Sequence, residues 1–248
     1  MSDDRKIALV TGANRGIGLE ICRQLAGRGV RVILTARDQA KGDVAAAALR
    51  AQGLDVVARA LDVTDERSVQ ALAHWIKSTY GRLDILINNA GVLLERIYGQ
   101  DANIETDAMD VDVDLVATII NTNTLGPLRT TQRLAPLMPA GGRIINLASQ
   151  MGLRSWANSN MVGYRVSKTA LMGLTANLAK GLAKKGITVN CMCPGWVKTD
   201  MGSRFAQITV DQGADTAIWL ALDADAKHSG KFFYKKQELT WDGQNVPA

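Results

Sequence analysis

Tyr164 and Lys168 are two residues whose types and spacing could carry out acid–base chemistry. Residues four positions apart leave from one face of a helix, and the stretch 169–174 favours a helix, so the phenol and the ammonium group lie within reach of each other. A free tyrosine has a pKa of about 10, and a nearby cation lowers this pKa by favouring the phenolate. The pair therefore predicts a tyrosine that donates a proton near neutral pH. Taken alone, the same spacing more often marks two solvated side chains on a surface helix.

Ser149 is a candidate partner for this tyrosine. It follows the apolar run 144–148, which is typical of a buried strand. The carboxyl ends of such strands are where open α/β sheets bind their ligands. A hydroxyl group at that position can hold the oxygen of a substrate.

Three glycines follow the first predicted strand, in the stretch 11–18. Their spacing permits a tight turn, a close approach of the backbone to a pyrophosphate, and close packing of helix against strand, with the helix N-terminus facing the phosphates. A strand-to-helix turn needs glycine in any case, so the triplet predicts dinucleotide binding only together with the other motifs. The cofactor contacts expected here are Gly12, Asn14, Arg15, Gly16, Ile17 and Gly18.

The residue type at the end of the second predicted strand indicates whether NAD or NADP binds. A carboxylate about 20 residues past the glycines would bind the ribose hydroxyls of NAD, whereas a cation there accommodates the 2′-phosphate of NADP. This chain has Ala36 and Arg37 at that point, and Arg15 in the glycine turn offers a second cation. The sequence therefore predicts NADPH or NADP as the cofactor. The alternative for each arginine is a solvated surface charge.

Two further strand ends carry polar groups. Asp62 and Val63 follow the third predicted strand, where a carboxylate and a backbone amide suit the edge of an adenine. The stretch 88–91 follows the fourth, and its asparagine amides can satisfy backbone groups where the chain passes a flat ligand. Stabilising the sheet is a rival role for Asn88. The candidate cofactor contacts are Asn89, Ala90 and Gly91.

Short apolar runs alternate with amphipathic stretches along the chain, which is typical of repeated βα units and a parallel sheet. Right-handed crossovers then put helices on both faces, so we expect an α/β, doubly wound fold. We expect one domain over 1–248, with cofactor binding mainly in the N-terminal half and with catalysis and substrate binding in the C-terminal half. The acid-rich piece 101–114 is predicted to be a solvated loop that enters a helix. The predicted strands are 7–10, 31–35, 55–60, 85–88, 143–147, 187–192 and 231–234.

Composition and charge exclude several classes of protein. With 47% hydrophobic and 21% charged residues the chain is an ordinary globular one, and no apolar run approaches the roughly 18 residues of a membrane span. The net charge is +5, but lysines and arginines are scattered, so we expect an anionic small ligand rather than nucleic acid. Three cysteines, an odd number without a secretory signal, predict reduced thiols in a cytoplasmic protein. Neither histidine has ligand spacing, so no metal site is expected.

In order and at the usual separations, these motifs make the chain resemble the short-chain dehydrogenase/reductase family over nearly its whole length. The resemblance implies a Rossmann-type sheet of about seven parallel strands, a nicotinamide cofactor and a catalytic set that falls here on Asn123, Ser149, Tyr164 and Lys168. Asn121 is a competing candidate, but Asn123 stands three residues before Gly126, as in the family pattern. The match rests on the stretches 11–18, 88–91, 123–126, 164–168 and 194–195, with Asp62 and Ser149.

Three stretches, which begin at Tyr164, Pro194 and Ser229, resemble the carbonyl-reductase-like branch of that family. Many animal members of the branch carry a helical insertion just before the tyrosine, whereas only 14 residues separate Ser149 from Tyr164 here. An insertion that would block contacts between copies is therefore missing, and a homo-oligomer is compatible with the sequence.

The resemblance implies NADPH-dependent reduction of a ketone or aldehyde to an alcohol. Ser149 and Tyr164 would donate hydrogen bonds to the carbonyl oxygen, hydride would come from the nicotinamide, and Tyr164 would protonate the alkoxide. Lys168 would lower the pKa of the tyrosine and hold the nicotinamide ribose, and Asn123 would hold a water in the proton relay. The further cofactor contacts implied are Pro194, Gly195, Val197 and Thr199.

Two other functions compete with this prediction. A non-catalytic NADPH-binding sensor or scaffold of the same fold would be favoured by loss of the tyrosine or the lysine, and both are present. An epimerase or dehydratase of a related fold usually spaces its glycines G-x-x-G-x-x-G, whereas the spacing here is G-x-x-x-G-x-G. Both observations favour the reductase.

An open, mostly hydrophobic substrate pocket is expected above the nicotinamide, because the residues just after the strand ends are mostly apolar and the short piece 202–209 offers little material for a lid. This predicts small-molecule carbonyl substrates with aromatic or bulky aliphatic groups. The alternative is that Trp156, Met161 and Trp196 pack the core or an oligomer interface. The candidate substrate contacts are Leu94, Ser149, Trp156, Met161 and Trp196.

Overall fold

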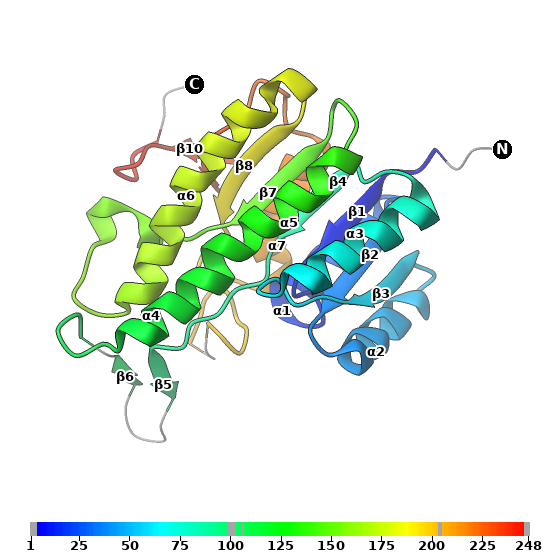
Figure 1. Cartoon of the computed structure of the whole chain (residues 1–248). Helices are drawn as coiled ribbons and strands as arrows, with labels where there is room; N and C mark the ends of the chain where they lie inside the picture. Colours follow the sequence, from blue (N-terminus) through cyan, green and yellow to red (C-terminus); the bar gives the residue numbers. More distant parts are fainter. Residues whose placement is uncertain (1–3, 99–102, 106, 203–204, 246–248) are drawn as a thin grey trace.

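A twisted sheet with helices on both faces forms the body of the molecule (Figure 1). The structure, a computed structural model, describes residues 4–98, 103–105, 107–202 and 205–245. The strands of the main sheet lie in the order β10-β9-β8-β7-β4-β1-β2-β3. Neighbouring strands pair in parallel except β9 and β10, which pair antiparallel. The doubly wound α/β fold is therefore confirmed.

The elements follow one another as alternating strands and helices, with a small separate hairpin of β5 and β6. The strands of the main sheet are β1 Ile7–Val10, β2 Arg31–Ala36, β3 Val56–Ala60, β4 Ile85–Asn88, β7 Arg143–Leu147, β8 Thr188–Cys193, β9 Phe232–Tyr234 and β10 Gln237–Leu239. The hairpin strands are β5 Arg96–Tyr98 and β6 Asn103–Glu105. The helices are α1 Gly16–Gly27, α2 Gln39–Arg50, α3 Glu66–Tyr80, α4 Val113–Ile120, α5 Gly126–Leu134, α6 Val162–Leu182 and α7 Val210–Leu222, with a π-helical turn Asn121–Leu125 between α4 and α5.

Strand β1 shows why the central strands are apolar throughout. Its alternate residues point to opposite faces, and both faces are covered. Ala8 and Val10 pack into the core with α1, α2 and α7, whereas Ile7 and Leu9 pack with α3, α5 and α6, the helices at the front of Figure 1. In the part of the chain that the structure describes, none of these helices is both long and apolar enough to cross a bilayer.

The crevice for a ligand lies where the strand order reverses. From β1 the chain proceeds outward to β2 and β3, and then returns to place β4 on the other side of β1. The connections that follow β1 and β4 therefore diverge at their carboxyl ends, which leaves a crevice between them. The glycine turn and the stretch that begins at Asn89 border this crevice.

All seven predicted strands are present. Each strand boundary that differs from the prediction is shifted by one residue. The edge strand β10 was not predicted because it has only three residues and depends on a turn, in which Lys235 and Lys236 have φ angles of 50° and 64°. The prediction of a loop over 101–114 is wrong for 103–105, where β6 pairs with β5, while residues 101–102 and 106 lie outside the described residues. A three-residue strand shows no periodicity that a sequence pattern could detect.

Candidate active site

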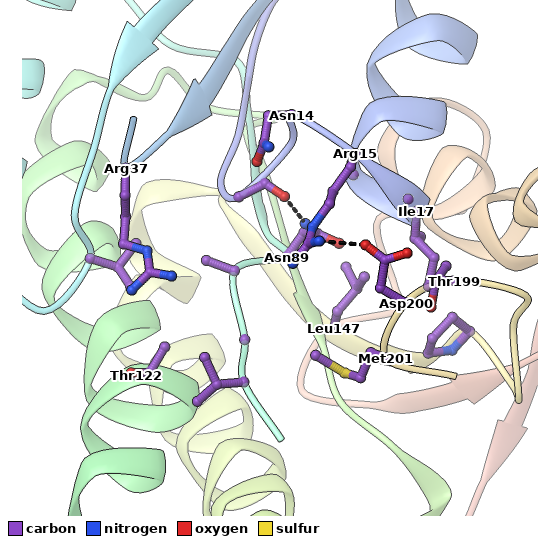
Figure 2. Close-up of a pocket in the computed structure, with 18 of the residues that line it drawn as sticks. Asn14, Arg15, Ile17, Arg37, Asn89, Thr122, Leu147, Thr199, Asp200 and Met201 are labelled. Atoms are coloured by element: carbon purple, nitrogen blue, oxygen red, sulfur yellow. Dashed lines mark hydrogen bonds and ion pairs between the residues drawn. The ribbon is translucent and has the colours of Figure 1, made fainter. Parts of the chain in front are cut away.

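A cavity of about 510 Å³ lies at the carboxyl ends of β1 and β4 (Figure 2). This volume lies in the range of small-molecule sites. The structure brings most of the predicted cofactor contacts to its wall, together with both residues of the tyrosine–lysine pair. The predicted residues that line the cavity are Gly12, Asn14, Arg15, Gly16, Ile17, Gly18, Arg37, Asp62, Val63, Asn89, Ala90, Gly91, Tyr164, Lys168, Pro194 and Thr199.

The glycine turn packs so closely on the end of β4 that side chains are excluded. Gly12 has a φ of +62°, and a Cβ there would lie 2.9 Å from the Cα of Ala90. A Cβ at Gly18 would lie 2.5 Å from the amide nitrogen of Asn89. Real Cβ atoms do not approach other atoms this closely, so both positions require glycine.

Asn89 and Thr11 fasten this turn to the sheet. The Asn89 side chain donates to the carbonyl oxygens of Thr11 and Gly12 at 2.8 and 2.9 Å. In return the Thr11 hydroxyl accepts from the backbone amides of Asn89 and Ala90. The asparagine amide therefore satisfies backbone groups, as the sequence predicted, and holds the turn in place beside the cavity.

Helix α1 begins at the cavity without a side-chain cap. Arg15, at the N-cap, makes no side-chain capping bond, and the first turn of the helix contains no acidic residue. The first N–H groups of a helix lack partners within it and favour anions. This arrangement, with glycine instead of side chains in the turn, fits the pyrophosphate of a dinucleotide.

The end of β2 offers a cation and no free carboxylate. Arg37 is exposed on the cavity wall, on the opposite side of Figure 2 from Arg15. Ala36 before it is buried, and the carboxylate of Asp38 caps α2 by accepting from the backbone amides of Ala40 and Lys41. The nearest acid is thus used within the helix cap, and the position suits a phosphate better than a ribose hydroxyl.

An ion pair that sequence reasoning missed spans the cavity mouth. Arg15 from the glycine turn donates to the carboxylate of Asp200, which belongs to the segment after β8 (Figure 2). Both side chains are about three-quarters exposed. Because 185 positions separate the two residues, no local pattern could have indicated the pair.

The tyrosine and lysine lie in the first two turns of α6, and the predicted helix is confirmed. The Lys168 ammonium lies 5.5 Å from the centre of the Tyr164 ring and donates to the carbonyl oxygen of Leu147 at 2.8 Å. Burial lowers the pKa of Lys168 to about 8. Burial also raises the pKa of Tyr164 to about 12, with a further increase from the charge of Cys193. The pKa of Tyr164 is therefore raised where the lysine was expected to lower it, and the largest cause is removal of the phenolate from water.

Ser149 and two cysteines surround this pair. Ser149 follows the end of β7 as predicted, and its hydrogen bond with Tyr164 lowers the pKa of the tyrosine against the larger effect of burial. The Ser149 hydroxyl also accepts from the amide of Met151 at 3.2 Å. Cys191 and Cys193 are buried thiols without a disulfide bond, and burial raises the pKa of both. Ser149 lies beside the hydroxyl of Tyr164 without lining the cavity wall itself.

Asn123, rather than Asn121, faces α6. Its side chain exchanges two hydrogen bonds with the backbone of Val92, at 2.8 and 2.9 Å, and donates to the hydroxyl of Ser167 at 3.0 Å. The Asn121 side chain instead accepts from Arg129. A Cβ at Gly91 would lie 3.3 Å from the Asn123 oxygen and 3.6 Å from the Lys168 nitrogen, so these three residues meet.

Asn88 is the last residue of β4 and does not line the cavity. It is 3% exposed, donates to Asn146 and accepts from Thr130, and Asn146 donates in turn to Thr175. The rival role of stabilising the sheet therefore applies to Asn88. At the next strand end, the Asp62 carboxylate lines the cavity and accepts from the amide and the hydroxyl of Thr64.

The predicted substrate contacts are not gathered on the cavity wall. Leu94, Trp156 and Trp196 are 45%, 52% and 49% exposed, whereas Met161 is buried. Gly195 and Val197 also do not line the cavity, and residues 203–204 of the predicted short piece lie outside the described residues. Sequence reasoning had not assigned several residues that do line it. These are Leu61, Thr64, Val92, Thr122, Leu147, Ala148, Lys198, Asp200 and Val210.

Comparison with known proteins gives a consistent result. The family model described as short chain dehydrogenase matches residues 6–208. Short-chain dehydrogenase/reductase 1 of Saponaria officinalis is 33% identical over 293 positions, which cover 95% of this chain and 96% of the relative. Carbonyl reductase (NADPH) 1 of Bos taurus is 32% identical over 291 positions, which cover 97% of this chain and 100% of the relative.

Among solved structures, a short chain dehydrogenase from Burkholderia cenocepacia J2315 in complex with NADP has a TM-score of 0.80 and 29% identity. The match covers 92% of this chain and 94% of that chain. The glycine turn, the tyrosine–lysine pair on α6 and the strand order thus occur together with similarity over almost the whole sequence. The chain belongs to the short-chain dehydrogenase family.

Proposed function

We propose that the protein reduces a ketone or aldehyde to an alcohol with NADPH as hydride donor. The observation that carries the proposal is that one cavity is lined both by a dinucleotide-type glycine turn and by Tyr164 and Lys168. The bovine relative is named as an NADPH carbonyl reductase, and the structural neighbour contains NADP. No specific observation favours a binding protein without turnover.

The residues of the wall fit the parts of this cofactor. The open N-terminus of α1 and the Gly12 turn would receive the pyrophosphate. Arg37 and Arg15 would hold the 2′-phosphate, since a guanidinium group matches the geometry of a phosphate. Asp62 and Val63 would lie at the adenine, and Pro194 and Thr199 at the carboxamide end. When bound, the nicotinamide supplies a hydride to the carbonyl carbon.

Tyr164 would deliver the proton. A pKa of about 12 keeps its hydroxyl protonated at neutral pH, as a reductase requires of its acid. A developing alkoxide is a stronger base than the phenolate, so proton transfer from this hydroxyl to the product oxygen is favourable. Ser149 would donate a second hydrogen bond to the same oxygen and would orient the substrate beside the tyrosine.

Lys168 and Asn123 would assist the proton transfer from Tyr164 without contacting the substrate. As the phenolate forms, the ammonium of Lys168 would stabilise it, and the pKa of about 8 makes both charge states of the lysine accessible near neutral pH. The Asn123 amide is already paired with Val92 and Ser167. A relay water would therefore have to be held by main-chain atoms of the π-helical turn, which refines the role predicted for Asn123.

The substrate would enter beside Tyr164 between partly exposed apolar side chains. Leu94, Trp156 and Trp196 are half-exposed apolar groups that a hydrophobic ligand would cover. Met161 is buried at the start of the catalytic helix, so it would define the floor of the pocket and make less direct contact. We infer a preference for aromatic or bulky aliphatic carbonyl compounds.

The test is a panel of carbonyl compounds with NADPH absorbance as the readout. We expect a hydrophobic aryl ketone to be reduced with a higher kcat/KM than a small anionic keto acid, and Trp156→Ala to reduce this difference. Oxidation of NADPH by no member of the panel would overturn the proposed function. A preference for the keto acid would overturn only the proposed substrate class.

Arg37→Ala tests the choice of cofactor. Because the variant loses a charge-assisted bond to the 2′-phosphate, we expect the KM for NADPH to rise by roughly tenfold or more while the KM for NADH changes little. Arg67→Ala removes an exposed arginine outside the cavity and is the matched control. An equal rise for both cofactors would contradict the assignment of Arg37 to the phosphate.

A further inference from the structure

We propose that Glu95 is a positioning residue that sets the start of the catalytic helix and, through it, the place of Tyr164. Glu95 belongs to the segment after β4, far from α6 in the sequence. One carboxylate oxygen accepts from the backbone amide of Gly163 at 2.7 Å, and the other accepts from the backbone amide of Tyr164 at 2.8 Å. The second bond is made to the residue that carries the proposed acid.

Helix α6 needs this partner because its own N-cap supplies none. Met161, at the N-cap, has a left-handed φ of 51° and makes no side-chain capping bond. The first N–H groups of the helix would otherwise be buried without acceptors, which destabilises a helix start. Glu95 supplies from a distance of 68 residues what a serine or aspartate at the N-cap normally supplies.

The buried Glu95 carboxylate is in turn stabilised by the N-terminus of α6. Glu95 is 1% exposed, and within the described part of the chain no lysine, arginine or histidine forms an ion pair with it. A buried charge without a partner is strongly unfavourable. The positive end of a 21-residue helix and two charge-assisted hydrogen bonds stabilise this charge, which locks the two elements together.

Gly163 permits the close approach. A Cβ at this position would lie 3.3 Å from the Glu95 carboxylate and 3.0 Å from the Cδ1 of Ile119. The carboxylate thus reaches the backbone of the first turn because no side chain covers it.

The same short segment also holds Asn123. Val92 exchanges hydrogen bonds with the Asn123 side chain, and three residues later Glu95 binds the first turn of α6. The segment 92–95 therefore positions two members of the proposed catalytic set at once. Displacement of a catalytic group by about 1 Å can cost on the order of 10²-fold in rate, so loss of this contact should be seen in turnover.

This inference rests on the proposed function, and Glu95→Gln tests it. Glutamine keeps the size of the side chain but loses the charge, and its NH₂ group opposes one of the two backbone donors. We expect kcat to fall by roughly tenfold and the KM for NADPH to stay within about twofold, because Glu95 does not contact the glycine turn or Arg37. In a Tyr164→Phe background the same change should cause no further fall in kcat, since Glu95 acts through Tyr164.

Amide hydrogen exchange gives a readout independent of activity. In Glu95→Gln we expect faster exchange in the stretch 162–168 and unchanged exchange in α1 and α3. Asp112→Asn, which changes the N-cap carboxylate of α4, is the matched control and should leave kcat within about twofold. Unchanged exchange at the start of α6, or an equal loss of kcat in the Tyr164→Phe background, would overturn the proposal. If exchange at the start of α6 rises in Glu95→Gln but the unmodified protein reduces no carbonyl compound, the result would contradict the proposed function and not the positioning role of Glu95.

Discussion

Burial acts in opposite directions on the pKa values of Tyr164 and Lys168. It raises the pKa of Tyr164 to about 12 and lowers the pKa of Lys168 to about 8, because in both cases it disfavours the charged form. The cavity therefore holds a protonated phenol beside an amine that changes its charge near neutral pH. In the proposed function, this protonated phenol would be the proton donor.

Tyr164→Phe isolates the proton of the phenol. Phenylalanine preserves the packing of the ring, so we expect NADPH to bind with unchanged affinity while kcat falls by roughly 10²-fold or more. Fluorescence titration of NADPH and steady-state rates measure the two quantities separately. Turnover close to that of the unmodified protein would show that another group supplies the proton.

Lys168→Met tests the pKa of the lysine through stability. A pKa lowered in the folded state means that the buried ammonium destabilises the fold below pH 8, and that this cost disappears as the pH rises from about 8 to 10.5. Urea unfolding should show Lys168→Met to be the more stable protein at pH 7, with the difference shrinking by pH 10. The cysteines titrate in both proteins, so their contribution largely cancels. A difference that is independent of pH would contradict the lowered pKa.

At the scale of elements, two connections that lie far apart in the sequence meet over the cavity. The glycine turn after β1 and the segment after β8 are joined by Arg15 and Asp200. In the proposed function Arg15 is also a ligand of the 2′-phosphate, so the carboxylate and the phosphate compete for one guanidinium group.

Asp200→Asn should therefore tighten NADPH binding. An exposed ion pair contributes about 0–1 kcal/mol, so the expected fall in the Kd of NADPH is up to about fivefold, with no change for NADH. Asp223→Asn breaks the exposed pair with Arg28, away from the cavity, and is the control. Weaker NADPH binding in Asp200→Asn would mean that the pair supports the cofactor site instead of competing with the phosphate.

At the scale of the whole molecule, a chain of buried hydrogen bonds connects the sheet with the helices in front of it. It runs from Thr130 on α5 through Asn88 on β4 and Asn146 on β7 to Thr175 on α6. Each group is buried, so each depends on its neighbour for a partner. Helix α6, which carries Tyr164 and Lys168, is thereby attached to β4 and β7.

Asn88→Ala should weaken the fold without changing the cofactor site. It leaves the buried Asn146 oxygen unpaired, so we expect the free energy of unfolding in urea to fall by about 1–3 kcal/mol and the KM for NADPH to stay unchanged. Asn177→Ala, which removes an exposed amide bonded to the carbonyl of Gly173, is the control. A large rise in KM without loss of stability would instead assign Asn88 to the cofactor.

The sequence by itself determined the fold class and the location of the site, because both follow from local patterns. Alternating apolar strands and helices specify the parallel sheet, and glycines directly after β1 mark the turn that lines the cavity. The spacing of Tyr164 and Lys168 specifies one face of one helix. These features depend on residues that are neighbours in the chain, and the structure agrees with each of them.

The tertiary structure alone decided which distant groups meet and how far each is buried. Glu95 reaches α6 and Asp200 reaches Arg15 only after the chain has folded, and neither has a neighbour in the sequence that indicates its partner. The pKa of Tyr164 rises where the spacing predicted a fall, because the spacing reports the nearby lysine but not the loss of water around the phenol. Desolvation and long-range pairing are properties of the packed molecule, and no local pattern contains them.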